Sequence, residues 1–363
     1  MSTPNTLLGI VDLLRWEGDT VNINGLCERF DDHIDCLFNA KEFAEAAGRS
    51  VFSGIKMLPD RERQKFLRAP QVVSQLIKWR RHRLGLDLRY LSELVLAELA
   101  QSGIIKDLPV RVWSSRGDIQ LPTVERDEDN QATPWLIDGE IAIDDKSPQM
   151  FPYDGTAQKL LLLLDDEDSA RVRQMLAAAL EVLSKALRPT FHLVKSFLRQ
   201  ISIRLEPGAP TIFNSSSFSQ YVGLALLINP HLKGVDVPNL TEALVHESIH
   251  SMLFMIEELE EPFLLDRASA RILVRSPWSG NIINLNAYLH ACLVWYGLFW
   301  LWTRLIETKA LPEHRCTVFR ERARSGFAHR QLSSISQHLP LLSRRIIGVV
   351  ETVEATMQQH GCH

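Results

Sequence analysis

An uncharged, strongly apolar run from Leu285 to Trp302 constrains the fold more than any other part of the sequence. Its 18 residues reach the shortest length that crosses a bilayer as a helix. Asn286 and His290 interrupt the run, however, and no second run accompanies it. We therefore expect a helix buried at the centre of a domain, and no membrane. An ionisable side chain inside such a helix, as at His290, requires a partner.

The composition is typical of a folded soluble protein that does not bind nucleic acid. Hydrophobic residues make up 45% of the 363 residues. The formal net charge is −4, whereas a nucleic-acid-binding protein needs a positive excess or a basic stripe. The five cysteines are odd in number and form no Cys-x-x-Cys pair, which favours free thiols and a cytoplasmic location.

The spacing of apolar residues predicts an α+β fold that is mostly helical. Helical spacing covers 39–47, 61–67, 70–79, 90–100 and 166–187, with Gly48 and Gly103 as stops. Strands are predicted over 110–113, 135–144, 201–205 and 221–229, and a loop at 215–217. After Pro238 the pattern is helical almost to the end of the chain. We expect a helical N-terminal region with a short β segment over 1–150, suited to peptide recognition, and a catalytic domain over 151–363.

The segment His246-Glu247-Ser248-Ile249-His250 has the pattern H-E-x-x-H. Residues four apart lie on one face of a helix, so both imidazoles reach a single metal ion. Glu247 lies about 100° around the helix from His246, close enough to contact a metal-bound water or to hold a ligand. The neighbouring residues are apolar nearly all round, so the helix is expected to be buried and its polar side chains need partners. This predicts a metal site rather than histidines that are satisfied within a core.

A third metal ligand is needed, and His290 is the first choice. It lies forty residues after His250, within the uncharged run. The acidic cluster at 257–261 follows the motif more closely, but it lies beside Pro262 and is expected to be solvated. His231 precedes the motif helix in a loop and is the second choice, although a histidine there is ordinarily exposed.

The strand expected at 221–229 comes directly before the motif helix. This is the zincin arrangement, in which the edge of the strand pairs with an extended peptide. We therefore expect a zincin-like, metalloprotease-like catalytic half, with a buried HExxH helix next to a small β-sheet.

Two arginines, Arg271 and Arg275, lie between the motif and His290. Arginines near a metal clamp a carboxylate through two parallel hydrogen bonds, and the alternative is a pair of surface arginines. Ser276-Pro277 and Ser279-Gly280 predict a turn that fixes the geometry. Ser276 and Trp278 are therefore assigned to the same cofactor site.

Three runs together resemble a known family: Leu244-Val-His-Glu-Ser-Ile-His250, Arg275-Ser-Pro-Trp-Ser-Gly280 and Tyr288-Leu-His-Ala291. They look like the HExxH-motif peptide-modification proteins, which are encoded near ribosomally made peptide natural products. The resemblance covers about 223–302, with a fainter likeness at 58–59 and 66–70. It implies an Fe(II)- and 2-oxoglutarate-dependent hydroxylase on a metalloprotease-like scaffold, acting on a side-chain β-carbon of a precursor peptide.

This resemblance implies that His246, His250 and His290 would hold iron. For binding the carboxylate of 2-oxoglutarate, physical reasoning favours Arg275 or Arg271. The usual non-haem iron site has two histidines and one carboxylate. Three imidazoles leave the iron more positive, which an anionic 2-oxoglutarate would offset.

Three functions therefore stay open. In the hydroxylase the iron centre takes hydrogen from the peptide, so Glu247 would organise a neighbouring ligand. In a zinc-dependent metallopeptidase zinc lowers the pKa of its water to about 7, and Glu247 would be the catalytic base. The third is a peptide-binding protein with a structural metal, but structural zinc sites usually have four ligands, often cysteines, and no cysteine here has suitable spacing. We favour the hydroxylase, which a dependence on 2-oxoglutarate distinguishes from the peptidase.

Overall fold

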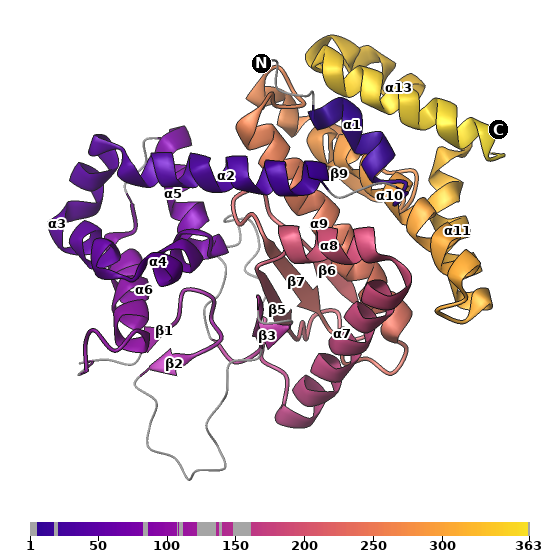
Figure 1. Cartoon of the computed structure of the whole chain (residues 1–363). Coiled ribbons are helices and arrows are strands. Elements are labelled where there is room, and N and C mark those ends of the chain that lie inside the picture. The colour runs from indigo at the N-terminus through magenta and orange to yellow at the C-terminus, as the bar shows by residue number, and fades with distance from the viewer. Residues whose placement is uncertain are drawn as a thin grey trace. The chain divides into compact units, whose positions relative to one another are not determined.

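The computed structural model describes residues 6–17, 21–82, 86–106, 108, 112–121, 136–137, 140–147 and 161–361. Most of these residues are helical and the strands form small sheets, which confirms the predicted α+β, mostly helical class (Figure 1). The chain divides into two compact units. The motif unit combines Met1–Cys27, Met175–Phe197 and Asp236–His363, and the sheet unit combines Glu28–Gln174 and Leu198–Val235. The boundary expected at residue 150 lies outside the described residues and stays a prediction.

Helices dominate the chain up to residue 101. They are α1 (Thr6–Leu13), α2 (Val21–Asn39), α3 (Lys41–Met57), α4 (Asp60–Leu67), α5 (Pro70–His82) and α6 (Leu88–Gln101). The sequence pattern did not predict α2. Gly48 has a φ of 75° and kinks α3, which continues to Met57 instead of stopping there.

A five-stranded sheet forms the centre of the sheet unit. Its order is β3 (Leu136–Ile137), β4 (Ile141–Asp144), β5 (Gln200–Arg204), β7 (Leu224–Ile228) and β6 (Asn214–Ser216). The three central strands are parallel, and β5 and β7 are buried along their whole length, as continuous apolar runs predict. A separate pair, β1 (Val112–Trp113) and β2 (Gln120–Leu121), is antiparallel. Between β4 and β5 the chain forms α7 (Asp166–Ala186) and α8 (Arg188–Phe197).

Strand β6 corrects two expectations. Ser215 pairs with Leu227 and Ser216 with Leu226, so the loop predicted at 215–217 is wrong for these two residues. Both edges of β7 are therefore occupied, by β5 and by β6. The expectation that β7 offers a free edge to an extended peptide is wrong.

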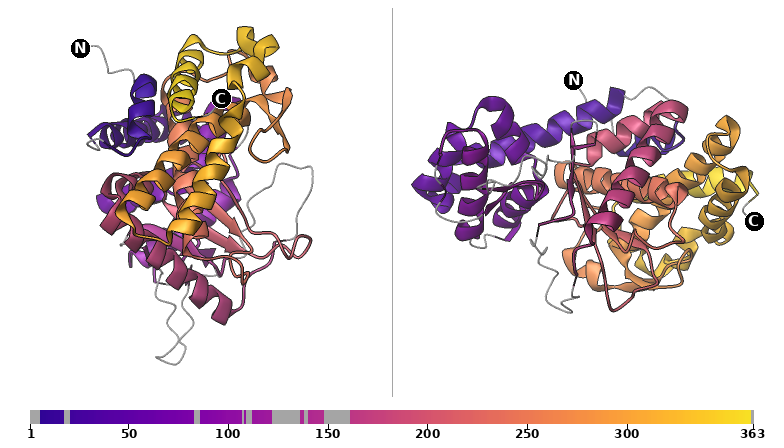
Figure 2. Two further views of the ribbon diagram at one scale, coloured as in Figure 1. Left: turned by 90° about the vertical axis from the view of Figure 1, so that its right-hand side faces the viewer. Right: turned by 90° about the horizontal axis from the view of Figure 1, so that it is seen from below.

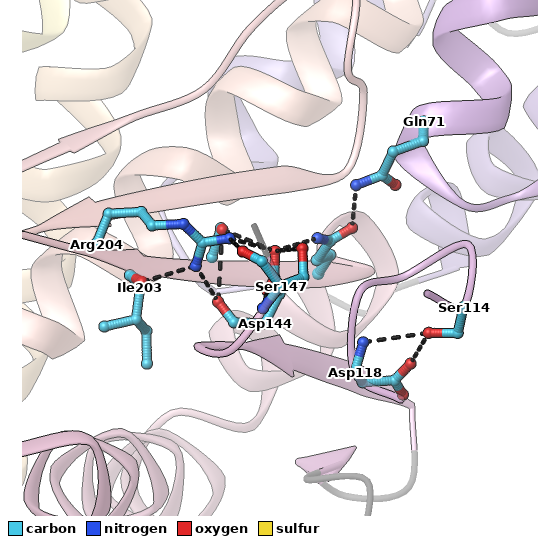
Figure 3. A network of polar contacts seen from close by, with 9 residues as sticks. Gln71, Ser114, Asp118, Asp144, Ser147, Ile203 and Arg204 are labelled. Carbon is cyan, nitrogen blue, oxygen red and sulfur yellow. Dashed lines mark hydrogen bonds and ion pairs between the residues drawn. The ribbon is translucent and has the colours of Figure 1, made fainter. Parts of the chain in front are cut away.

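A buried ion pair joins the ends of β4 and β5. Arg204 Nη2 donates to Asp144 Oδ2 at 2.7 Å, and Arg204 Nη1 donates to the Asp144 carbonyl oxygen at 2.7 Å (Figure 3). The Ser147 N–H and the Ser202 hydroxyl donate to the same carboxylate at 3.0 and 3.1 Å. Burial raises the pKa of Asp144 to about 6, against the opposing effect of Arg204. Each charge has several partners, so this pair ties two strands together and is not an open site.

The motif unit is built around two long helices that pack against each other, α9 (Val237–Leu259) and α10 (Leu285–Thr308). α10 also packs against α11 (Glu313–Ser325) and α13 (Arg344–Gln359) (Figure 2). α1 packs against α13, so segments from both ends of the chain meet (Figure 1). α10 is long and apolar enough to cross a membrane, but 72% of its most apolar window is buried inside the protein, in agreement with the expected core helix.

A hairpin interrupts the helices after Pro238, where the sequence pattern predicted helix almost throughout. It consists of β8 (Leu273–Arg275) and β9 (Ile282–Asn284), which are antiparallel. The turn expected between them forms: Gly280 has a φ of 71°, and its N–H donates to the Ser276 carbonyl oxygen at 2.9 Å. The short elements η2 (Arg267–Arg271), η3 (Gly326–Ala328), α12 (Gln331–Ser334) and η4 (Ser336–Leu341) complete the unit.

The four cysteines that the structure describes are free thiols, as expected. Cys292 and Cys316 are buried, and burial raises the pKa of both thiols. A raised pKa disfavours the thiolate, which is the reactive form of cysteine. Cys362 lies outside the described residues.

Candidate metal centre

Helix α9 contains the whole HExxH motif, and its start is set by a capping box. The Asp236 side chain accepts from the Asn239 N–H at 3.2 Å, and the Asn239 side chain accepts from the Asp236 N–H at 3.2 Å. Pro238 lies in the first turn, where its missing N–H costs nothing. From this start, His246 and His250 fall on the same face of the helix.

His246, Glu247 and His250 bring three donor groups together, with their ligand atoms within 4.8 Å of one another. An ion with bonds of about 2.0–2.1 Å holds its ligand atoms at most about 4.2 Å apart, slightly less than this limit. The two histidines are half-buried, whereas Glu247 is 1% exposed.

Helix α10 brings His290 to His250. Their Nδ1 atoms are 3.2 Å apart, and their rings are nearly parallel, with an angle of 17°. Two nitrogens bound to one ion at about 2.0–2.1 Å, at tetrahedral or octahedral angles, lie about 2.8–3.4 Å apart. The 3.2 Å between the Nδ1 atoms falls within this range, and it also suits a hydrogen bond between the two rings. The rings of Phe254 and Phe263 pack on His290, which is 1% exposed.

Glu257 is the partner of His290 and was expected to be solvated. This expectation is wrong, because its side chain is only 13% exposed and accepts from His290 Nε2 at 2.8 Å. The Asn286 side chain and the Phe263 N–H also donate to this carboxylate, each at 3.3 Å. Burial acts to raise the pKa of Glu257, but the bond from His290 and these further contacts outweigh it and lower the pKa. The tautomer that donates from Nε2 to Glu257 would present its bare Nδ1 to His250, the arrangement that metal-binding histidines with carboxylate partners have.

The spacing between His250 and Glu257 in the sequence could have indicated that Glu257 lies near the site. Glu257 follows His250 by seven residues, about two helical turns, so both lie on the same face of α9. The cluster of four acidic residues hid this spacing, because such clusters are usually solvated.

His250 is held in the form that binds metal. Burial, and then the neighbouring His246 and His290, lower the pKa of His250 well below its ordinary value of 6.5. A neutral imidazole has a lone pair for a metal ion, so the site needs little proton release from His250 at neutral pH.

The two arginines assigned to the cofactor are exposed. Arg275 Nη1 donates to the Gly280 carbonyl oxygen at 2.8 Å, within the hairpin itself. Arg271 is the last residue of η2. Among the described residues, neither arginine forms a hydrogen bond or an ion pair with the three histidines, and their role stays a prediction. His231, the second choice for a ligand, belongs to the sheet unit.

A series of aromatic ring contacts connects the hairpin turn to the motif. Ser276 is buried, and its N–H donates to the Asn281 carbonyl oxygen at 2.8 Å. Trp278 Nε1 donates to the Ala323 carbonyl oxygen at 2.9 Å, and the indole stacks on Trp295, with centroids 6.0 Å apart. Trp295 in turn meets the His246 ring edge-on, with centroids 6.0 Å apart. Trp278 is therefore two ring contacts away from the candidate metal ligands.

Sequence reasoning missed a second charged pair near the motif. Glu242, one helical turn before His246, is buried and accepts from Trp302 Nε1 at 2.8 Å. It also forms an ion pair with Arg322 of α11. The position of Glu242 four residues before His246 was visible in the sequence, but its partner on a distant helix was not.

Comparison of the chain with protein-family models gives no match, and comparison with the sequences of curated proteins gives none either. The likeness to the HExxH peptide-modification proteins therefore rests on the three runs that carry it.

Proposed function

We propose that the chain is an Fe(II)- and 2-oxoglutarate-dependent hydroxylase that acts on a side-chain β-carbon of a ribosomally made peptide. The observation that carries the metal centre is the 3.2 Å spacing of the His250 and His290 Nδ1 atoms, beside the half-buried His246. The choice of iron and 2-oxoglutarate rests on the three runs shared with the peptide-modifying family. The catalytic half is proposed to be zincin-like, and the precursor peptide and the cytoplasmic location belong to the same proposal.

Iron with 2-oxoglutarate and O₂ supplies an oxidant strong enough to remove hydrogen from an unactivated carbon. The protein contributes the three imidazoles that hold the ion. Glu257 orients His290 through the bond to its Nε2. Glu247, 1% exposed on α9, organises the neighbouring ligands. Trp278 and Trp295 form an aromatic wall on the His246 side of the site.

A zinc-dependent metallopeptidase is the second candidate, because H-E-x-x-H on a helix is also the motif of those enzymes. Glu247 would then take a proton from a zinc-bound water. One observation favours the hydroxylase over the peptidase. Glu247 is 1% exposed whereas His246 and His250 are half-buried, which suits an orienting role.

The test is incubation of the protein with Fe(II), 2-oxoglutarate and peptides encoded beside it, followed by succinate assay and mass spectrometry. The hydroxylase yields succinate and a peptide heavier by one oxygen. Glu247→Gln should retain measurable activity, within about the 10–100-fold loss expected for a residue that orients a ligand. A peptidase instead yields two shorter peptides with zinc, and Glu247→Gln then removes about 10²–10⁴-fold or more of the activity. Cleavage without succinate would reject the hydroxylase, and Glu261→Gln serves as the matched control.

A further inference from the structure

We infer that Arg322, rather than Arg275 or Arg271, binds a carboxylate of the ligand that occupies the histidine cluster. This inference rests on the proposed function for the source of that carboxylate, which in a hydroxylase is the distal end of 2-oxoglutarate. Its physical basis is the position of Arg322, and that position does not depend on the reaction.

Two separate contacts place Arg322 beside the motif. Its guanidinium carbon lies 5.4 Å from the ring centroid of Trp295, and that ring lies 6.0 Å from the ring of His246. The guanidinium is therefore at most about 11 Å from the His246 ring, the sum of these two distances. Arg322 also pairs with Glu242, which precedes His246 by one turn of α9.

The guanidinium plane of Arg322 is held in place before any ligand binds. Its carbon lies 4.8 Å from the ring centroid of Phe319 as well as over Trp295. Glu242 accepts from Arg322 Nη2 and is itself fixed by the indole N–H of Trp302. Stacking and pairing of this kind reduce the entropy that is lost when a carboxylate binds.

Donors remain available on Arg322. The hydrogen bond to Glu242 uses Nη2, whereas a guanidinium carries five N–H donors. The side chain is 45% exposed, and among the described residues the bond from Nη2 to Glu242 is its one hydrogen bond. A planar fork with accessible donors binds a carboxylate through two parallel hydrogen bonds.

The other arginines suit this role less well. Arg275 Nη1 donates to Gly280 within its own hairpin. Arg271 is exposed and has no contact with the aromatic wall among the described residues. Arg320, on the same helix as Arg322, pairs with its neighbour Glu321 and provides a matched control.

The length of 2-oxoglutarate agrees with this placement. A five-carbon dicarboxylate that is bound to an ion at one end carries its far carboxylate about 7 Å from the ion. A paired guanidinium carbon lies about 4 Å beyond that carboxylate. The Trp295 contacts set an upper limit of about 11 Å between the Arg322 guanidinium and the His246 ring, so a dicarboxylate of this length is long enough to join the two.

The experiment is a calorimetric titration of the Co(II)-loaded protein with 2-oxoglutarate and with 2-oxobutyrate, which lacks the distal carboxylate. Arg322→Gln should lower the affinity for 2-oxoglutarate by about 10–150-fold, the range for a hydrogen bond to a charged group. It should leave the affinity for 2-oxobutyrate unchanged. Arg322→Lys keeps a cation beside Glu242 and protects the fold, but it lacks the fork and should also bind 2-oxoglutarate more weakly. Arg320→Gln should bind both acids as the wild type does. A loss of 2-oxoglutarate affinity in Arg275→Gln but not in Arg322→Gln would overturn the inference.

A second arm separates this inference from the proposed function. If the wild type binds neither 2-oxo acid, the hydroxylase proposal fails, and the probes become succinic monohydroxamic acid and butyrohydroxamic acid, which bind a metal through the hydroxamate. A wild-type preference for the carboxylate-bearing hydroxamate that Arg322→Gln abolishes supports the inference. Equal affinity of the wild type for the two hydroxamates would overturn it.

Discussion

The protonation of His250 makes the stability of the metal-free protein depend on pH. Burial and the neighbouring His246 and His290 hold the pKa of this imidazole well below 6.5 in the folded state. The unfolded chain has the ordinary pKa, so between pH 7.5 and 5.5 it takes up a proton that the folded protein does not. The free energy of unfolding therefore falls as the pH falls.

The size of the effect follows from this difference. Below the unfolded pKa of about 6.5, the slope approaches 1.36 kcal/mol per pH unit. Between pH 7.5 and 5.5 the contribution of His250 to the free energy of unfolding decreases by about 1.4 kcal/mol. His250→Gln cannot take up a proton and should lose this part of the pH dependence.

The assay is urea unfolding in the presence of a chelator, followed by tryptophan fluorescence. Five of the eight tryptophans belong to the motif unit, so the signal reports mainly on that unit. The difference in unfolding free energy between wild type and His250→Gln should change by about 1.4 kcal/mol across the two pH values. His314→Gln, at an exposed position, is the control and should follow the wild type. Parallel profiles for wild type and His250→Gln would refute the reasoning.

Two substitutions test the surroundings of the site. Glu257→Gln removes the charge that orients His290 and should weaken metal binding about 10–100-fold in a competition titration, whereas Glu261→Gln should not; equal affinities would exclude the orienting role. In Gly326→Ala the new Cβ would lie 2.2 Å from Trp278 Nε1, so the free energy of unfolding should fall by about 1–3 kcal/mol. Gly348→Ala, where nothing lies within 4 Å, should leave it unchanged or raise it, and a similar loss in both would contradict the steric argument.

Periodic features of the sequence were sufficient to predict the helix that carries His290 and the central strands of the sheet unit. The apolar run of α10 and the buried strands β5 and β7 have strong local patterns, because each is enclosed by protein. The hairpin β8–β9 had no such pattern. Its strands are three residues long, and two of its apolar side chains, Leu273 and Ile282, are exposed at 66% and 55%, so apolar residues do not mark the inward-facing positions.

The partners within the site depended on packing between helices, which the sequence does not display. Glu257 belongs to an acidic cluster, and its burial follows from the position of His290 on another helix. Arg322 is one of several arginines on α11, and it differs from Arg320 only because that side of α11 meets Trp295 and Glu242. The contacts that define the roles of Glu257 and Arg322 join residues that are 33 and 80 positions apart in the sequence.

The most direct test of the central claim is a Co(II) titration of the purified, metal-free protein followed by its visible absorption. The wild type should bind one ion per chain, because His246 and His250 belong to one cluster of donor groups and His290 lies beside His250. His290→Ala should bind the ion much more weakly, and the double variant His246→Ala/His250→Ala should show no absorption change while remaining folded. A wild type that binds no Co(II), or a double variant that binds it as tightly as the wild type, would contradict the metal centre.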